Sequence, residues 1–240
     1  MNNREAIISF SFDDFPRTAY TAGGLLLERF GARGTFYTAC GLMNTANDSG
    51  EQFRAGDLES LLERGHELAS HTFGHVSCRA LSGAAFCRDV EKGAKAVEEI
   101  TGLEATNFAY PFGHVSLETK RALGSSVSSA RGIIPGFNGP EVDLNLLRAN
   151  SLYGDVDSVG PAEKLIVENA QRKSWLIFYT HDVQPQPSAY GCTPALLARA
   201  VECAVRSGCQ ILTVQKALDW AGIQNGNSEG HAHRHVAASI

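Results

Sequence analysis

The chain has 240 residues, 43% of them hydrophobic and 20% charged, which is enough for one sizeable core and does not require a second domain. Its 21 basic and 26 acidic residues give a formal net charge of -5, and the basic residues are scattered, so no nucleic acid or anionic membrane surface is expected as a partner. No apolar run approaches the roughly 18 to 20 residues that cross a bilayer, and no signal peptide pattern is visible. We therefore expect a cytoplasmic protein with no membrane span.

Short β-branched or aromatic runs alternate with amphipathic stretches along the chain, which is typical of β-α-β units around a mostly parallel sheet. Helices are expected where an apolar stripe lies between capping and stop signals. The expected strands are 6–12, 34–38, 67–70, 107–110, 126–129, 146–150, 175–179 and 210–214, and the expected helices are 58–64, 86–100, 161–172 and 194–207. Such a pattern fits a closed (β/α) barrel or an open doubly wound sheet, and periodicity does not separate the two.

Two stretches rich in glycine and proline, 132–145 and 184–193, are expected to be loops that border a site. From residue 224 onward the composition turns to small polar residues and histidine, with no apolar pattern that offsets the entropy of ordering. We expect a single catalytic domain over 1–223 and a disordered tail over 224–240.

A pair of carboxylates, Asp13 and Asp14, ends the first expected strand. Neighbouring side chains diverge at a strand end, so one carboxylate is able to bind a metal ion while the other faces a water molecule. A solvated turn is the ordinary alternative for two adjacent aspartates, and the pair alone does not decide between them.

Two histidines, His71 and His75, follow the third expected strand at a spacing of four residues. On a helical turn this spacing places both imidazoles on one face, where they reach a single divalent ion at Zn–N distances of about 2.0 to 2.1 Å. We therefore expect a metal site that includes these two side chains.

Two further strands end in residues suited to catalysis. Pro111 and Gly113 form a rigid turn after one of them, and His181 with Asp182 follows the apolar strand 175–179. Barrels of the (β/α) type place their catalytic groups at the carboxyl ends of strands, so this distribution of the four motifs favours the barrel.

Together these motifs resemble the polysaccharide deacetylase family, carbohydrate esterase family four, also described as the nodulation-type deacetylase homology domain, over roughly residues 6–214. The resemblance implies an α/β fold, a distorted (β/α) barrel of seven or eight strands with a mostly parallel sheet. It also implies metal-dependent hydrolysis of an N-acetyl amide on a sugar or glycan precursor.

Ser-Phe-Asp-Asp at 11–14 matches the family's Thr-Phe-Asp-Asp motif, which implies that Asp13 is the general base and Asp14 a metal ligand. His-Thr-Phe-Gly-His at 71–75 matches the motif that supplies the other two ligands, His71 and His75.

The third motif departs from the family's usual Arg-x-Pro-Tyr-Gly, because Ala109 stands in place of the arginine and Phe112 in place of the tyrosine. The chain resembles a subgroup with a Phe-Ala-Tyr-Pro-Phe-Gly turn, in which the backbone N–H of Phe112 takes the oxyanion role. We hypothesise that Arg148, at a later strand, supplies the missing cation beside the base.

The last motif, Leu-x-Leu-x-His in the family, matches residues 177–181, with Tyr179 in place of the second leucine. The resemblance implies that His181 is the general acid, tuned by Asp155, Asp157 or Asp182, and the sequence does not choose among these three. The residues expected to contact the substrate are Tyr110, Pro111, Phe112 and Tyr179.

The implied cofactor is one divalent metal ion, with zinc favoured and cobalt, nickel or manganese also suited to two imidazoles and a carboxylate. The expected partner is an N-acetylated sugar or oligosaccharide, and the lack of an export signal favours a small or membrane-associated precursor. One alternative is an amidohydrolase that opens a non-sugar amide or a cyclic ureide on the same scaffold. Another is a catalytically silent carbohydrate-binding homologue, which the changes at Ala109 and Tyr179 allow and the presence of Asp13 and His181 disfavours.

Overall fold

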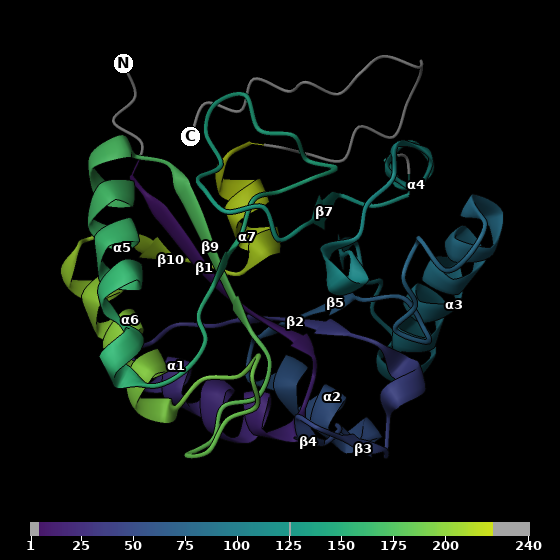
Figure 1. Ribbon diagram of the computed structural model, residues 1–240, viewed down its shortest axis with the longest axis horizontal. Coiled ribbons are helices and arrows are strands. Elements are labelled where there is room, and N and C mark those ends of the chain that lie inside the picture. Colours follow the sequence, from purple (N-terminus) through teal and green to yellow (C-terminus); the bar gives the residue numbers. More distant parts are fainter. Residues whose placement is uncertain (1–4, 125, 223–240) are drawn as a thin grey trace.

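The computed structural model describes residues 5–124 and 126–222, and its centre is a curled sheet of parallel strands with helices around it (Figure 1). The strand order is β7-β6-β5-β2-β1-β9-β8, and β10 pairs with the first residues of β1. The strands are β1 (Ile7–Asp14), β2 (Thr35–Thr38), β5 (Glu67–Ser70), β6 (Asn107–Ala109), β7 (Ser129–Arg131), β8 (Asn150–Ser151), β9 (Trp175–Thr180) and β10 (Gln210–Ile211). A short antiparallel hairpin, β3 (Ala46–Asn47) and β4 (Gly50–Glu51), lies outside this sheet. The expected distorted (β/α) barrel is confirmed.

Helices connect the strands and cover the outer face of the sheet (Figure 1). The four expected helices are present as α2 (Ala55–Glu63), α3 (Gly83–Thr101), α5 (Gly160–Arg172) and α6 (Pro194–Arg206). Three short helices were missed because each has only two turns or fewer to show an apolar stripe: α1 (Leu25–Arg29), α4 (Leu117–Leu123) and α7 (Val214–Trp220). The expectation of a strand over 210–214 was wrong at its end, since Val214 begins α7.

The N-terminal caps follow the usual preference for side chains that accept hydrogen bonds from the first turn. Ser82 Oγ accepts from the N–H of Ala85 at the start of α3. At α2 the cap position is Arg54, and Asp57 lies three residues later, where its carboxylate accepts from the Arg54 N–H at 2.9 Å.

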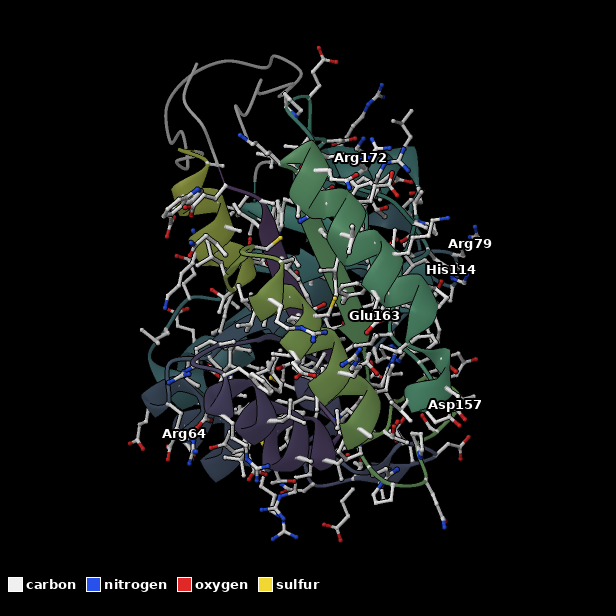
Figure 2. The ribbon with its side chains drawn as sticks, turned by 90° about the vertical axis from the view of Figure 1, so that its left-hand side faces the viewer. Arg64, Arg79, His114, Asp157, Glu163 and Arg172 are labelled. Carbon is white, nitrogen blue, oxygen red and sulfur yellow. The ribbon has the colours of Figure 1, made fainter. Side chains whose placement is uncertain are left out.

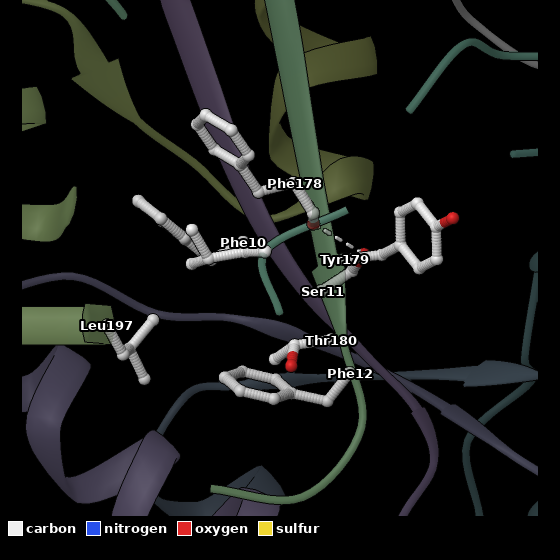
Figure 3. A pocket seen from close by; sticks show the side chains of 8 residues that line it. Phe10, Ser11, Phe12, Phe178, Tyr179, Thr180 and Leu197 are labelled. Carbon is white, nitrogen blue, oxygen red and sulfur yellow. Dashed lines mark hydrogen bonds between the residues drawn. The ribbon is translucent and has the colours of Figure 1, made fainter. Parts of the chain in front are cut away.

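Alternate residues of β1 and β9 face opposite sides of the sheet, as the two-residue period of a strand requires. Phe10, Phe12 and Phe178 point toward Leu197 of α6, whereas Tyr179 points to the other side (Figure 3). The first group belongs to the main core between the sheet and the helices, where the Phe10 and Phe178 rings stack with centroids 5.7 Å apart. Tyr179 belongs to a second core on the concave face, so odd-numbered residues of β1 and β9 point toward the barrel interior.

The barrel is closed irregularly between the edge strands β7 and β8. Leu147 forms a single parallel bridge with Arg131, and the Leu147 N–H donates to the Ala130 carbonyl at 2.8 Å. The strand expected over 146–150 is present only as the bridge at Leu147 and, after it, as β8. Glycines and prolines in the preceding loop interrupt a longer ladder. The stretch 132–145 is a loop, as expected.

Charged side chains cover the outer surface of α5 and α6, which pack side by side (Figure 2). Glu163 on α5 pairs with Arg199 on α6 at 2.8 Å, and Arg172 lies at the far end of α5, paired with Glu168. Among residues 5–124 and 126–222, no helix combines the length and apolar character needed to cross a bilayer. The tail expected to be disordered, 224–240, lies outside the described residues.

Candidate active site

The carboxyl ends of β1 and β5 bring together the two motifs that the sequence singled out. Asp14 is the last residue of β1, and His71 directly follows β5. Asp14 and Phe15 both adopt left-handed backbone conformations, with φ of 65° and 68°. This change of conformation ends the strand and lets the neighbouring carboxylates of Asp13 and Asp14 point to different partners.

Asp14, His71 and His75 form a compact group that fits a metal ion. The Nε2 atoms of His71 and His75 lie 3.4 Å and 3.1 Å from Asp14 Oδ1, and one donor atom from each side chain lies within 4.8 Å of the others. Asp14 Oδ1 is buried and has no hydrogen-bond partner among the described residues. A buried oxygen of this kind calls for an explanation, and a cation held by one carboxylate and two imidazoles provides it.

The protonation states also suit metal binding. His71 Nδ1 lies 2.8 Å from the Ala109 carbonyl oxygen, which only accepts, so Nδ1 carries the proton and the lone pair of Nε2 faces Asp14. Burial lowers the pKa of His75 to about 4, and the charge of His71 acts in the same direction. Burial alone would raise the pKa of Asp14, but the electrostatic influence of the neighbouring His71 and His75 imidazoles outweighs it, so the pKa falls to about 2. A neutral imidazole and an ionised carboxylate are the forms that bind metals.

The segment that carries the histidines is a loop, and the expectation of a helical turn was wrong. Thr72 and His75 have φ of 63° and 50°, which is incompatible with a right-handed helix. The loop nevertheless brings the two rings together, with centroids 5.1 Å apart.

Asp13 forms a buried ion pair with Arg131, the last residue of β7. Only 1% of the Arg131 side chain and 6% of the Asp13 side chain are exposed. The guanidinium carbon lies 4.7 Å from the centre of the Tyr37 ring and 5.0 Å from that of Tyr179, and Nη1 donates to the Gly132 carbonyl at 3.0 Å. Arg131 is therefore the cation that orients Asp13.

The hypothesis that Arg148 takes this position was wrong. Arg148 is exposed, and its Nη1 donates to the Pro135 carbonyl at 3.0 Å. The sequence contained a usable signal for Arg131, because this residue ends a strand. The strand was expected over 126–129 and lies at Ser129–Arg131. Because the expected end was two residues too early, Arg131 was not among the side chains expected at strand ends.

His181 follows β9 and is held by the loop 184–193, which was expected to border the site. Its Nδ1 lies 3.1 Å from the Tyr190 carbonyl oxygen, so Nδ1 carries a proton and Nε2 is the ring nitrogen left to exchange a proton. The ring lies between those of Tyr153 and Tyr190, with centroid distances of 6.1 Å and 5.7 Å. The charge of His181 is among the causes that lower the pKa of Asp14, which places both residues at the same end of the barrel.

A backbone carbonyl therefore takes the place expected for an aspartate beside His181. Asp182 is fully buried and accepts from the N–H of Ser188 and the Nε2 of Gln184, both at 2.8 Å, so its carboxylate braces the loop. Asp155 accepts from the N–H of Asp157 at 3.1 Å and begins the short turn η4 (Val156–Ser158), and Asp157 is exposed (Figure 2).

The third motif forms a short helical turn, η3 (Pro111–Gly113), which buried Pro111 begins. Phe112 has a φ of 60° and is 55% exposed, and its ring centroid lies 4.5 Å from that of His75. Tyr110 was expected to contact substrate, but its side chain is buried in a third core cluster, where its hydroxyl donates to the Asn145 carbonyl at 3.3 Å. Of the expected substrate contacts, Phe112 is the one with a largely exposed ring beside the metal ligands.

A family model described as polysaccharide deacetylase matches residues 1–126, a stretch that includes Asp13, Asp14, His71, His75 and the third motif. The chain belongs to the polysaccharide deacetylase family. A similar curated protein is the peptidoglycan-N-acetylglucosamine deacetylase PgdA of Listeria monocytogenes, which is 28% identical over 118 residues, 49% of this chain and 24% of that protein. This chain thus aligns with about a quarter of the length of that relative.

Solved structures with the same fold cover nearly the whole chain of this family member. The Xyl-CE4 domain of a multidomain xylanase from the hindgut metagenome of Trinervitermes trinervoides superposes with a TM-score of 0.61 at 17% identity, covering 97% of this chain and 99% of that domain. A family 4 acetyl xylan esterase from Clostridium thermocellum, in complex with a cobalt ion, gives 0.57 at 18% identity, covering 91% and 93%. Peptidoglycan deacetylase PdaC from Bacillus subtilis gives 0.56 at 17% identity, covering 92% and 94%.

Proposed function

We propose that this chain is a metal-dependent N-deacetylase, which hydrolyses an N-acetyl amide on a sugar or glycan precursor to acetate and a free amine. The observation that supports it most strongly is that two groups of side chains lie together at one end of the barrel. Asp14, His71 and His75 form the metal-binding group, and the neighbouring carboxylate of Asp13 is held apart from them by Arg131. Family membership supports the same reaction class.

The metal is proposed to be zinc, with cobalt, nickel or manganese as ions that the same ligand types accept. Asp14, His71 and His75 would hold it through one carboxylate oxygen and two Nε2 atoms. When bound by three protein ligands, such an ion lowers the pKa of water toward about 7 and polarises a carbonyl group.

Asp13 is proposed as the general base that accepts a proton from the attacking water. The water oxygen then forms a bond with the acetyl carbon, and the carbonyl oxygen becomes negatively charged. Arg131 fixes the orientation of Asp13, because the guanidinium is itself held between the Tyr37 and Tyr179 rings. A positioned base of this kind accelerates a reaction by about 10² to 10⁴.

The backbone N–H of Phe112 is proposed to stabilise the developing oxyanion. Phe112 is the second residue of a helical turn, where an N–H has no acceptor within the turn. His181 is proposed as the general acid: in its doubly protonated form it gives the Nε2 proton to the departing nitrogen as the C–N bond breaks, which leaves neutral His181, acetate and a free amine. Its Nε2 is suited to this because Nδ1 is occupied by the Tyr190 carbonyl.

An N-acetylated sugar is the substrate class that we propose, in keeping with PgdA and PdaC, which are peptidoglycan deacetylases. The exposed ring of Phe112 beside His75 offers an apolar surface on which a sugar ring can pack. Tyr190, which is 60% exposed and lies next to His181, offers a second.

Acetate release tests the proposal. Purified protein is incubated with N-acetylglucosamine, chitin oligomers, peptidoglycan fragments and a non-sugar acetamide, with and without a strong chelator, beside Asp13→Asn. We expect acetate from at least one sugar, loss on chelation with recovery on adding zinc, and a rate at least about 100-fold lower in Asp13→Asn. Acetate release that persists after complete metal removal contradicts the metal-dependent mechanism, and hydrolysis of the acetamide alone favours a non-sugar amidohydrolase.

A further inference from the structure

Helix α3, which supplies no ligand itself, contacts the loop between the two histidine ligands. Asp89 lies on this helix, and its Oδ1 accepts hydrogen bonds from two successive N–H groups of the loop. The distances are 2.8 Å from the N of Phe73 and 2.9 Å from the N of Gly74. These two residues stand directly between His71 and His75, so one carboxylate oxygen fixes the backbone that joins the two ligands.

Helix α3 also touches the loop through its own backbone, one turn beyond Asp89. A Cβ atom at Gly93 would lie 2.6 Å from the carbonyl carbon of Thr72 and 2.8 Å from the N of Phe73. Only glycine permits so close an approach. Lys92 adds a third contact, with its Nζ 3.6 Å from the centre of the Phe73 ring.

The loop needs such support because its backbone is unfavourable. Thr72 and His75 both lie in the left-handed region, and non-glycine residues remain there only when their surroundings hold them. The loop is also held from the turn η2 (Cys40–Leu42), where the Gly41 N–H donates to the Phe73 carbonyl at 2.7 Å. The two ligands differ in their own support: His71 is anchored through its Nδ1 to Ala109, whereas His75 follows the residues that Asp89 holds.

We propose that Asp89 is a positioning residue of the metal site, which fixes His75 through the N–H groups of Phe73 and Gly74. This proposal rests on the proposed function, because it assumes that Asp14, His71 and His75 bind a metal ion. Without the carboxylate, the Gly74 N–H loses its acceptor and the Phe73 N–H keeps only the Asp89 backbone carbonyl at 3.0 Å, so His75 leaves its place beside Asp14 more readily. The predicted consequence is weaker metal binding, with the ligands themselves unchanged.

The zinc affinity of the full metal-free chain, measured by competition with a chromophoric chelator, tests this role. Changes to groups that support metal ligands typically weaken binding by about 10- to 100-fold, and we expect about tenfold weaker binding in Asp89→Ala. Asp89→Asn retains an oxygen able to accept the same two hydrogen bonds and should restore most of the affinity. Glu91→Ala removes an acidic side chain from an exposed position of the same helix and should bind zinc like the wild type.

Gly93→Ala provides a second test that removes no polar group. The added methyl group would come within 2.6 Å of the Thr72 carbonyl carbon and 2.8 Å of the Phe73 N, so α3 and the loop must move apart. We expect this shift to move the segment that carries His75 and so to weaken zinc binding. Wild-type zinc binding with unchanged affinity in both Asp89→Ala and Gly93→Ala overturns the role of Asp89, whereas a wild-type chain that binds no zinc contradicts the proposed function itself.

Discussion

Arg131 and Asp13 are 118 residues apart in the sequence and form an ion pair inside the barrel. Each comes from the carboxyl end of its strand, β7 for Arg131 and β1 for Asp13. Because both side chains are buried, neither charge is stable there without the other. The pair therefore couples the proposed base to the far edge of the sheet.

Replacing Arg131 should remove both stability and activity. Arg131→Met leaves Asp13 buried and unpaired, so the free energy of unfolding should fall by about 3 kcal/mol and kcat/KM by about 100-fold or more. Arg148→Met is the matched control, because Arg148 is exposed, and its stability should stay within about 0.5 kcal/mol of the wild type. Urea unfolding and acetate release measure the two quantities. A fully active Arg131→Met variant contradicts the assignment.

The sequence predicted the ligand group because its signals are local. Asp14 ends an apolar strand, and His71 and His75 are four residues apart, so each motif was visible within a short stretch. The alternation of strands and helices predicted the α/β class, and the four motifs at strand ends favoured the barrel over an open sheet. The conformation of the histidine loop was not predictable in this way, since Thr72 and His75 are held in left-handed conformations by contacts with Asp89 and Gly41.

The partner of Asp13 was not predictable because it depends on long-range register. Ala109 at the motif position showed only that the usual arginine is absent. Arg148 lies within the strand expected over 146–150, whereas Arg131 lies two residues beyond the strand expected over 126–129 and was not among the expected site residues. Similarly, the acceptor for His181 is a backbone carbonyl of Tyr190, and a carbonyl has no signature in the sequence.

His181→Gln should separate proton transfer from metal binding. Loss of a general acid lowers kcat by about 10² to 10⁴, while zinc affinity should remain near the wild-type value because the metal-binding group is Asp14, His71 and His75. Parallel zinc titrations and acetate assays are required. If the variant loses zinc binding as well, His181 acts as a ligand and the proposed division of roles is wrong.

Phe112→Gly should distinguish the backbone N–H from the ring. Glycine keeps the N–H and accepts the φ of 60° without strain, so kcat should change little. The exposed ring beside His75 would be absent, and KM for the sugar should rise several-fold if the substrate packs on it. A large fall in kcat with unchanged KM would instead show that the ring itself is needed for the chemical step.

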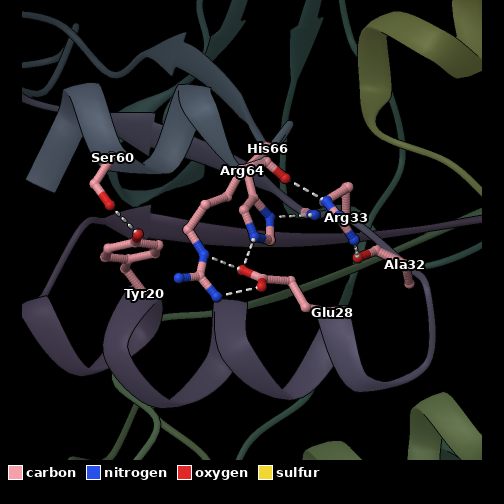
Figure 4. Close-up of polar contacts among 8 residues, drawn as sticks. Tyr20, Glu28, Ala32, Arg33, Ser60, Arg64 and His66 are labelled. Atoms are coloured by element: carbon pink, nitrogen blue, oxygen red, sulfur yellow. Dashed lines mark hydrogen bonds and ion pairs between the residues drawn. The ribbon is translucent and has the colours of Figure 1, made fainter.

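A buried histidine away from the site makes stability depend on pH. His66 Nδ1 accepts a hydrogen bond from the Gly34 N–H at 3.0 Å, so Nδ1 is unprotonated, and Nε2 lies 3.1 Å from Oε1 of Glu28 (Figure 4). Glu28 in turn pairs with Arg64. Burial lowers the pKa of His66 below its usual 6.5, although the hydrogen bond and charge of Glu28 act in the opposite direction.

Because the folded state lowers the pKa of His66, its contribution to stability is complete above about pH 6.5 and is lost as the pH falls toward the lower value. Asn is able to accept the Gly34 N–H but does not titrate. The decrease in unfolding free energy of the metal-free protein between pH 7.5 and pH 5 should therefore be smaller in His66→Asn than in the wild type. Equal decreases in the two proteins would show that His66 does not titrate in this range.

Zinc titration of the metal-free chain, with acetate release measured at each step on a sugar that the wild type deacetylates, tests the central claim most directly. The account predicts that activity rises in proportion to bound zinc, reaches its maximum at about one ion per chain as expected for a single three-ligand site, and is lost together with tight binding in His75→Ala. Full activity before any zinc is added, or unchanged tight binding in His75→Ala, would contradict it.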